Sequence, residues 1–208
     1  LVTVEQSLSK NHAQVFWFLR PENWVSPPRE AEILIVLAGL RFQTAPGMFS
    51  HKSVDPGSAM LARHLGQVKG KAADFCAGWG YLSAELLRQC RAVSSLDLFE
   101  ADYASLEVAR LNVCAPDAAL PVNFHWVDLA DETVSPGFDW IIMNPPFHTS
   151  RSADAGLGQS MIAAASKALK PGGRLLMVAN KQLPYEDTLQ RAFRKFDRIE
   201  EDRQFKVI

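Results

Sequence analysis

The segment with the clearest chemistry is Asn144-Pro145-Pro146-Phe147, which follows the apolar stretch 138–143. A strand cannot continue through two prolines, because neither donates an N–H to the ladder, so the strand must end near Asn144. The Asn144 side chain and the Pro145 carbonyl then supply two fixed acceptors, and Phe147 supplies an aromatic face. These groups suit a planar amino group on a stacked heterocycle. We therefore expect a site for an exocyclic base amine, with a turn that only ends a strand as the alternative.

A second candidate segment is the turn 76–80, Cys-Ala-Gly-Trp-Gly, between an apolar run and a helical stretch. Gly78 and Gly80 allow the backbone to turn tightly and to approach a ligand closely. The turn is a poor dinucleotide fingerprint, because the third glycine of GxGxxG falls at Ser83. It fits S-adenosylmethionine better, since that ligand has no pyrophosphate. A glycine turn that merely joins a strand to a helix is the alternative.

Two carboxylates follow later apolar runs. Glu100 ends the second run, where a carboxylate can accept hydrogen bonds from both hydroxyls of a ribose. Asp97 lies inside that run, and Asp102 is expected to begin the following helix as its cap. Asp128 closes the third run, where it could accept from an adenine amino group while Leu129 covers the ring. A surface turn remains the alternative for Asp128.

These segments must be positioned by alternating strands and helices. Such alternation predicts a largely parallel sheet with helices on both faces, and ligands bind beyond the carboxyl ends of its strands. A helix stop is expected at Pro171-Gly172-Gly173, and a hairpin or bent strand at 33–44. The expected strands are 72–76, 92–99, 122–127, 138–144, 174–179 and one or two within 198–208, and the expected helices are 81–89, 103–113, 158–169 and 185–193.

Composition bounds the class of protein. The chain has 208 residues, 48% of them hydrophobic, which fits one well-packed domain with a short appendage. The longest apolar stretch, Ile33 to Leu40, is much shorter than the ~20 residues that a membrane crossing needs, and no leader opens the chain. A soluble cytoplasmic protein without a membrane partner is expected. The chain starts at Leu1 and stops at Ile208 inside a predicted strand, which suggests a fragment.

Charge and cysteine content exclude further classes. The net charge of −1 argues against binding of nucleic acid by charge alone. Three cysteines without a CxxC pair indicate neither a disulfide framework nor a zinc site, and the histidines form no HExxH motif. We therefore expect no metal.

Several segments together resemble class I methyltransferases. More narrowly, they are similar to the methyltransferase small domain of the guanine-N2 methyltransferases known as ribosomal RNA small subunit methyltransferase C. The resemblance implies a Rossmann-like α/β fold, a seven-stranded mostly parallel sheet with helices on both faces and a last antiparallel strand. It implies a methyltransferase domain at 45–208, after an appendage or remnant of a preceding domain at 1–44. The segments that carry it are 46–50 (Pro-Gly-Met-Phe-Ser), 54–58 (Val-Asp-Pro-Gly-Ser), the turn 76–80, 144–148 (Asn-Pro-Pro-Phe-His), 178–180, 183–185 and 205–207.

The resemblance implies methyl transfer from S-adenosylmethionine to a guanine amino nitrogen of ribosomal RNA, with the RNA or the small ribosomal subunit as partner. One departure is Cys76, which stands where the family has its first loop glycine. The implied catalytic residues are Asn144, Pro145, Pro146 and Phe147; the cofactor-binding residues are Asp74, Cys76, Ala77, Gly78, Gly80, Glu100, Ala101, Asp128, Leu129 and Asn144; and the substrate-binding residues are Phe49, Phe147 and His148.

Other functions remain open at this point. Protein-glutamine and DNA-adenine methyltransferases use the same Asn-Pro-Pro device, more often with Tyr where Phe147 stands. A catalytically silent module that holds RNA or protein is a hypothesis from another class, motivated by Cys76 and by the near-neutral charge. A nicotinamide dehydrogenase is disfavoured by Ser83.

Overall fold

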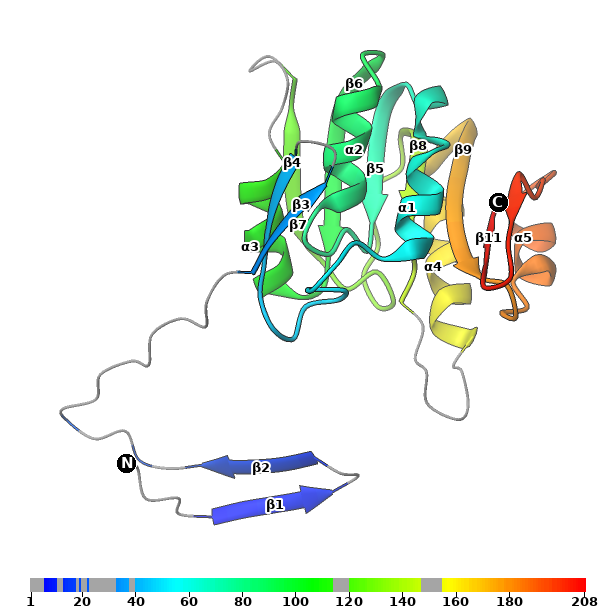
Figure 1. Cartoon of the computed structure of the whole chain (residues 1–208). Coiled ribbons are helices and arrows are strands. Elements are labelled where there is room, and N and C mark those ends of the chain that lie inside the picture. The colour runs from blue at the N-terminus through cyan, green and yellow to red at the C-terminus, as the bar shows by residue number, and fades with distance from the viewer. Residues whose placement is uncertain are drawn as a thin grey trace. The chain divides into compact units, whose positions relative to one another are not determined.

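The computed structural model describes residues 6–10, 13–17, 19, 22, 33–37, 40–113, 120–146 and 155–208. The chain divides into two compact units, Leu1–Ala31 and Glu32–Ile208. In the first unit, β1 (Gln6–Lys10) pairs antiparallel with β2 (Ala13–Trp17) (Figure 1). The boundary between 44 and 45 that the sequence suggests stays a prediction.

The second unit is built on a seven-stranded sheet with the order β10-β11-β9-β8-β5-β6-β7. The strands from β9 to β7 are parallel, and β11 runs antiparallel to β9. The predicted fold class is therefore confirmed, including the antiparallel last strand. The strands are β5 (Gly70–Phe75), β6 (Val93–Glu100), β7 (Val122–Trp126), β8 (Phe138–Met143), β9 (Leu169–Asn180), β10 (Glu200–Glu201) and β11 (Phe205–Val207).

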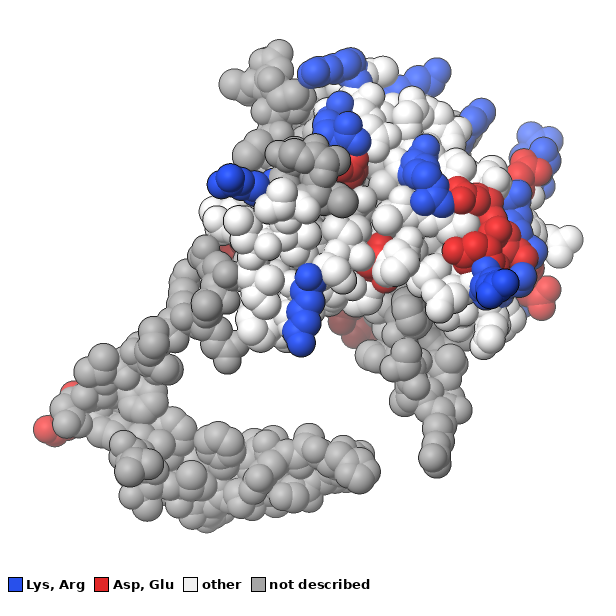
Figure 2. All heavy atoms as spheres, viewed as in Figure 1, with Lys and Arg blue, Asp and Glu red and all other residues white. Residues whose placement is uncertain are grey.

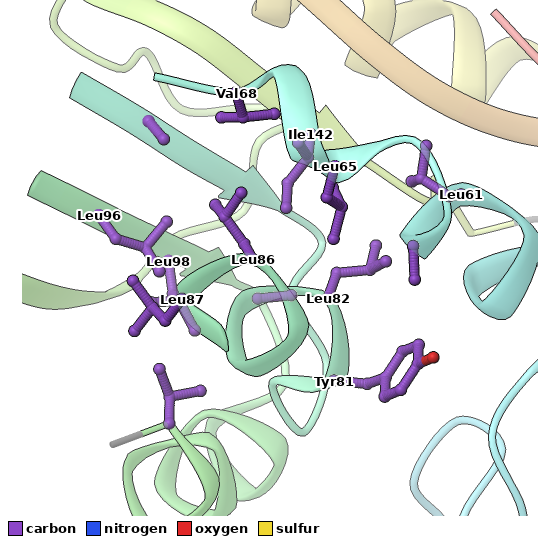
Figure 3. Packing of buried hydrophobic residues seen from close by; sticks show 14 of the residues in the cluster. Leu61, Leu65, Val68, Tyr81, Leu82, Leu86, Leu87, Leu96, Leu98 and Ile142 are labelled. Carbon is purple, nitrogen blue, oxygen red and sulfur yellow. The ribbon is translucent and has the colours of Figure 1, made fainter. Parts of the chain in front are cut away.

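Helices cover both faces of the sheet (Figure 1). Side chains alternate along β8, so Ile142 faces one hydrophobic cluster and Ile141 the other. The first cluster includes residues of α1, α2 and α3, and Figure 3 shows Leu82 and Leu86 of α2 packed among them. The second includes residues of α4 and α5. The helices are α1 (Pro56–Ala62), the short 3₁₀ helix η1 (Leu65–Gln67), α2 (Tyr81–Gln89), α3 (Tyr103–Asn112), α4 (Ala155–Ala168) and α5 (Glu186–Ala192).

Two elements differ from what the sequence pattern predicts. Helix α1 is absent from the expected elements, because seven residues are too few to show a helical period. Helix α4 ends at Ala168, and β9 starts at Leu169, five residues before the predicted strand. The segment Pro171–Gly173 therefore lies inside β9, where the pairing register with β8 shifts. The expected helix stop at Pro171–Gly173 is therefore wrong: α4 has already ended before this segment, which belongs to β9.

A second hairpin packs beside the sheet. It consists of β3 (Ile33–Leu37) and β4 (Leu40–Thr44), paired antiparallel as one of the two expected forms. The Gln43 N–H donates to Asn112 Oδ1 at 2.8 Å, and Asn112 Nδ2 donates to the Gln43 carbonyl at 2.9 Å. These two bonds hold β4 against the end of α3.

Helix α1 is held against the antiparallel edge of the sheet. A Cβ on Gly57 would lie 2.9 Å from the Phe205 ring of β11, so only glycine allows this approach. At the other end of the helix, Arg63 and His64 pair with Glu200 of β10. Figure 2 shows the mixed acidic and basic cluster around β10 and β11 on the right of the view. These contacts fix α1 against β10 and β11.

None of the helices in the described part of the chain is both long enough and apolar enough to cross a membrane.

Candidate active site

A cleft opens beyond the carboxyl ends of β5 and β8. These strands are neighbours on either side of the point where the strand order reverses, the usual place for a ligand in such a sheet. The cleft brings together five residues that the sequence predicted, namely Phe49, Cys76, Ala77, Gly78 and Asn144. Its other lining residues are Ser50, Asp55, Ser58, Trp79, Tyr81 and Leu82. The acceptor segment after β8 and the glycine turn after β5 therefore share one cleft.

The two glycines of the turn serve different purposes. Gly80 has φ +89°, and a Cβ there would lie 2.6 Å from Val113 Cγ2, so it lets α2 pack closely against the end of α3. Gly78 has φ +55°, and a Cβ there would meet nothing within 4 Å. Gly80 is thus required by packing, whereas Gly78 leaves its backbone open to a ligand.

Cys76 adopts a conformation that favours glycine. Its φ is +61°, in the left-handed region, where an L-residue costs roughly 1–2 kcal/mol. This is the position at which the family resemblance expects a glycine, so the backbone has kept the shape of the turn although the residue has changed. Burial raises the pKa of the Cys76 thiol well above its usual value, and the nearby carboxylates add to the shift. The thiol is therefore neutral, and Cys76 is half-buried at the lining of the cleft.

Glu100 at the end of β6 contacts the glycine turn directly. Its Oε2 accepts from the Gly78 N–H at 2.7 Å, and its Oε1 accepts from the Asp102 N–H at 2.8 Å. Each carboxylate oxygen has a further lone pair, so the group can still accept from a ligand hydroxyl. Ala101 follows Glu100 at the same edge, where its carbonyl accepts from Trp126 Nε1 at 2.9 Å.

Asp97 and Asp102, the other two carboxylates near the end of β6, have partners outside the predicted ribose contact. Asp102 is the N-cap of α3, and its side chain accepts from the Ala104 and Ser105 N–H groups, so the predicted cap is confirmed. Asp97 is buried inside β6, and its Oδ1 accepts from Asn123 and lies 2.7 Å from His125 Nε2.

Asp74 lies beneath the glycine turn rather than in the lining of the cleft. It is fully buried, and its Oδ2 accepts from Ser83 Oγ at 2.7 Å. Burial raises the pKa of Asp74 to about 7, opposed by the Ser83 hydrogen bond and assisted by the charge of Glu100. The hydrogen bond between Asp74 in β5 and Ser83 in α2 links the two elements on either side of the glycine turn. Asp74 therefore supports the conformation of the turn and does not contact the cleft itself.

The segment after β7 reaches the end of β6. The Val127 N–H donates to the Glu100 carbonyl at 3.1 Å, which places Asp128 and Leu129 next to that strand end. Asp128 Oδ1 accepts from the Ala130 N–H inside its own turn at 2.9 Å. Leu129 is 5% exposed and belongs to the second hydrophobic cluster. Both features fit a turn, and the proposed adenine contact stays a prediction.

The Asn144 side chain is anchored by two residues that the sequence analysis did not include in the site. Its Nδ2 donates to Asp55 Oδ2 at 3.1 Å and to Ser58 Oγ at 2.8 Å. Asp55 is the N-cap of α1, and Pro56 occupies the first helical position. An Asp-Pro pair of this kind is a recognisable helix start, so the signal for α1 was present in the sequence.

Phe49 lies at the mouth of the cleft. Its side chain is 53% exposed, while its backbone carbonyl accepts from Trp79 Nε1 at 2.8 Å. Trp79 itself is buried against Phe42 and Tyr81. The backbone of Phe49 is therefore fixed to the glycine turn, and its ring stays available to a substrate.

The remaining predicted site residues divide into two groups. Pro145 is buried, and Pro146 is exposed. Phe147 and His148 lie outside the described residues, so their predicted contacts with substrate stay predictions. Within the ranges that the structure describes, no group of three or more His, Cys, Asp or Glu residues could hold a metal ion.

Curated proteins similar to this chain include methyltransferases of ribosomal RNA. A ribosomal RNA small subunit methyltransferase C from Chromohalobacter salexigens is 34% identical over 186 residues, which are 86% of this chain and 54% of the relative. One from Hahella chejuensis is 31% identical over 96% of this chain and 59% of its own length. The chain thus spans somewhat more than half the length of these curated relatives.

A solved structure and a family model extend the comparison. A 16S rRNA N2 methyltransferase from T. thermophilus, solved with AdoMet and guanosine, superposes with a TM-score of 0.75 at 26% identity. The superposition covers 100% of this chain and 57% of that one. The model of the methyltransferase small domain matches residues 39–208. This chain therefore belongs to the methyltransferase small domain family.

Proposed function

We propose that this chain transfers a methyl group from S-adenosylmethionine to the exocyclic N2 amine of a guanine in ribosomal RNA. The observation that carries the proposal is the shared cleft, in which Asn144 lies with the glycine turn. The names of the relatives support ribosomal RNA of the small subunit as the substrate class. Because that RNA is assembled into ribosomes in the cytoplasm, we propose a cytoplasmic location.

The residues around the cleft fit the cofactor. Glu100 offers a carboxylate at the strand end for the ribose hydroxyls, and the open backbone at Gly78 allows close approach. We assign the adenine end to Ala101, Asp128 and Leu129. The remaining backbone contacts fall to Cys76, Ala77 and Gly80, with Asp74 supporting the turn from below. When bound, S-adenosylmethionine supplies a methyl group that its sulfonium centre has already activated.

The acceptor segment would raise the reactivity of the substrate amine. The lone pair of a guanine amine is delocalised into the ring, which makes the amine a poor nucleophile. Asn144 Oδ1 and the Pro145 carbonyl, each accepting one N–H, would favour the pyramidal nitrogen of the transition state and stabilise the positive charge that grows on it.

Two further features complete the mechanism. As the new N–C bond forms and the S–C bond breaks, the amine becomes cationic and releases a proton to solvent, so a dedicated base is not required. The cleft contributes by alignment of the amine for in-line attack. We assign stacking of the extruded base to Phe147, with Phe49 and His148 as further substrate contacts.

A single experiment tests the substrate and the reaction together. The protein is incubated with labelled S-adenosylmethionine and, in parallel, with naked 16S rRNA or purified small ribosomal subunits, and the RNA is then digested to nucleosides. Label in N2-methylguanosine is expected, and the Asn144→Ala protein is the control. Label in N6-methyladenosine, or in glutamine of a ribosomal protein, would instead identify one of the rival enzymes.

A second candidate function is a silent binding module of the same fold. It is favoured by one observation, the Cys76 side chain in the cleft where the family resemblance expects a glycine. Isothermal titration with S-adenosylmethionine and S-adenosylhomocysteine separates the two functions. Heat that fits a single site supports the enzyme, and no heat with either ligand supports the silent module.

A further inference from the structure

The start of α1 presents two buried oxygen atoms to the active site. Asp55 and Ser58 are 8% and 7% exposed, and the Ser58 N–H donates to Asp55 Oδ2 at 2.7 Å. This bond closes the cap of the helix and fixes the Asp55 side chain. Because α1 is also seated on Phe205 through Gly57, the two oxygens have a defined position beside the end of β8.

Both oxygens bind the same end of the Asn144 amide. A side-chain amide has two N–H donors, and Nδ2 of Asn144 uses them on Asp55 Oδ2 and Ser58 Oγ, 89 and 86 residues away. The nitrogen end of the amide is therefore fully engaged by α1. The oxygen end, Oδ1, makes no hydrogen bond to the residues that the structure describes, so it can accept from a substrate.

The partner at α1 is selective for that orientation. A carboxylate has acceptors but no donors, so it can pair with the nitrogen end of an amide but not with the oxygen end. Turning the amide over would place Oδ1 against Asp55 Oδ2, where neither atom carries a proton, and so would break that hydrogen bond in a buried place, which is unfavourable. It would also present an amino group to the amino group of the substrate, two donors facing each other. The Ser58 hydroxyl can donate as well as accept, so Ser58 anchors the amide and Asp55 selects its orientation.

We propose that Asp55 and Ser58 are positioning residues that set the orientation of the Asn144 amide, so that its carbonyl meets the substrate amine. The inference rests on the proposed function, because it assigns a role to the same amide. It adds a determinant of the reaction that lies on another element, and it gives α1 a task beyond packing.

The chain contains a matched control for this role. Ser105 in α3 occupies the same helical position as Ser58, is 4% exposed, and follows an aspartate cap, Asp102. Its hydroxyl donates to that cap, within the first turn of its own helix. Ser58→Ala and Ser105→Ala therefore remove the same atom from equivalent sites, and only the first removes an acceptor from Asn144.

The first test compares these variants by kinetics on small-subunit RNA. Ser58→Ala is expected to lower kcat about tenfold, the scale of one lost hydrogen bond that positions a reacting group, while the Kd for S-adenosylmethionine stays within about twofold. Ser105→Ala is expected to leave both values unchanged. Asp55→Asn caps a helix as well as aspartate does, but its side chain offers an amino group as well as an oxygen, so it no longer selects one orientation of Asn144 and is expected to lower kcat by up to about tenfold. Equal kcat for Ser58→Ala and Ser105→Ala would refute the proposal.

The second test does not depend on activity. The side-chain NH₂ signals of Asn144 are assigned in ¹⁵N spectra by their loss in Asn144→Ala. Slow hydrogen exchange of these signals is expected in the unaltered protein, with exchange at least tenfold faster in Ser58→Ala and unchanged in Ser105→Ala. If exchange is equally fast in all three proteins, the orientation is not fixed by α1. If the exchange results hold but no guanine is methylated, the proposed function fails while the anchored amide stands.

Discussion

The helices α1 and α3 start with the same local motif near the candidate site, but the side chains of the two motifs bind different partners. Each begins with an aspartate cap, Asp55 or Asp102, and each has a buried serine at its third residue, Ser58 or Ser105. In α3 the serine hydroxyl turns back to its own cap. In α1 the serine and the cap both bind Asn144, which follows a strand far along the chain.

The difference shows that the same Asp-Ser helix cap can either only start a helix or also hold a side chain of the candidate site. At α3 the cap only starts a helix, while the backbone N–H of Asp102 supports Glu100 on the cofactor side of the cleft. At α1 the cap starts a helix and also holds the acceptor amide on the substrate side. The two helix starts thus support two halves of the candidate site, and each half can be broken separately.

The largest expected effect is on the substrate side. Asn144→Ala should lower kcat by ~10² to 10³, the scale of removing one hydrogen-bond partner of a transition state, because the paired acceptors lose one member. The Kd for S-adenosylmethionine should change much less than kcat, because Asn144 is only one of the residues expected around the cofactor and Glu100 and the glycine turn are kept. Single-turnover rates and calorimetry measure the two quantities, and a rate equal to that of the unaltered protein, with folding verified by circular dichroism, would remove Asn144 from the mechanism.

The second largest expected effect is a loss of affinity for the cofactor, with a smaller loss of turnover. Glu100→Ala should raise the Kd for S-adenosylmethionine by ~10- to 100-fold, because hydrogen bonds to a charged group contribute ~1.5–3 kcal/mol. At saturating cofactor, kcat should fall much less than in Asn144→Ala. Calorimetry provides the comparison, with Glu107→Ala as an exposed control on α3. An unchanged Kd would overturn the ribose assignment.

The two caps provide a finer contrast. Asp55→Ala and Asp102→Ala should each lower the free energy of unfolding by ~1 kcal/mol, because each helix loses its cap. Only Asp55→Ala should also lower kcat, by about tenfold, since only Asp55 accepts from Asn144. Urea denaturation and turnover are measured on both proteins. Equal kcat values in the two variants would mean that the α1 cap has no more than a structural role.

The smallest effect concerns the turn between the two halves. Cys76→Gly should raise the free energy of unfolding by up to ~1 kcal/mol, because glycine relieves the left-handed strain at φ +61° but loses more backbone entropy on folding. Thermal denaturation measures it. Ser50→Gly, at the other described non-glycine residue with positive φ, is the comparison. A lower melting temperature for Cys76→Gly would show that the thiol packing outweighs the strain.

The sequence predicted the features that are local in the chain. Apolar runs and their breaks placed β5, β6 and β8 within one or two residues, and they placed Asn144 and Glu100 at strand ends. Helix α1 was not predicted because its hydrophobic period is too short to detect, although Asp55-Pro56 is a local signal for a helix start. The bonds from Asn144 to Asp55 and Ser58 could not be predicted either, since they depend on how distant elements pack. The strand β9 was placed too late because Pro171 and the two glycines after it normally end regular structure.

Under the proposed mechanism, the bonds between α1 and Asn144 make turnover depend on the docking of a helix from another part of the chain. The amide gains its direction only when residues 55–58 dock against the strand that precedes it, although 86 or more positions separate the bonded residues in the chain. A molecule in which residues 55–58 have frayed away from Asn144 has no oriented acceptor. On gentle heating, turnover should therefore be lost before the sheet melts.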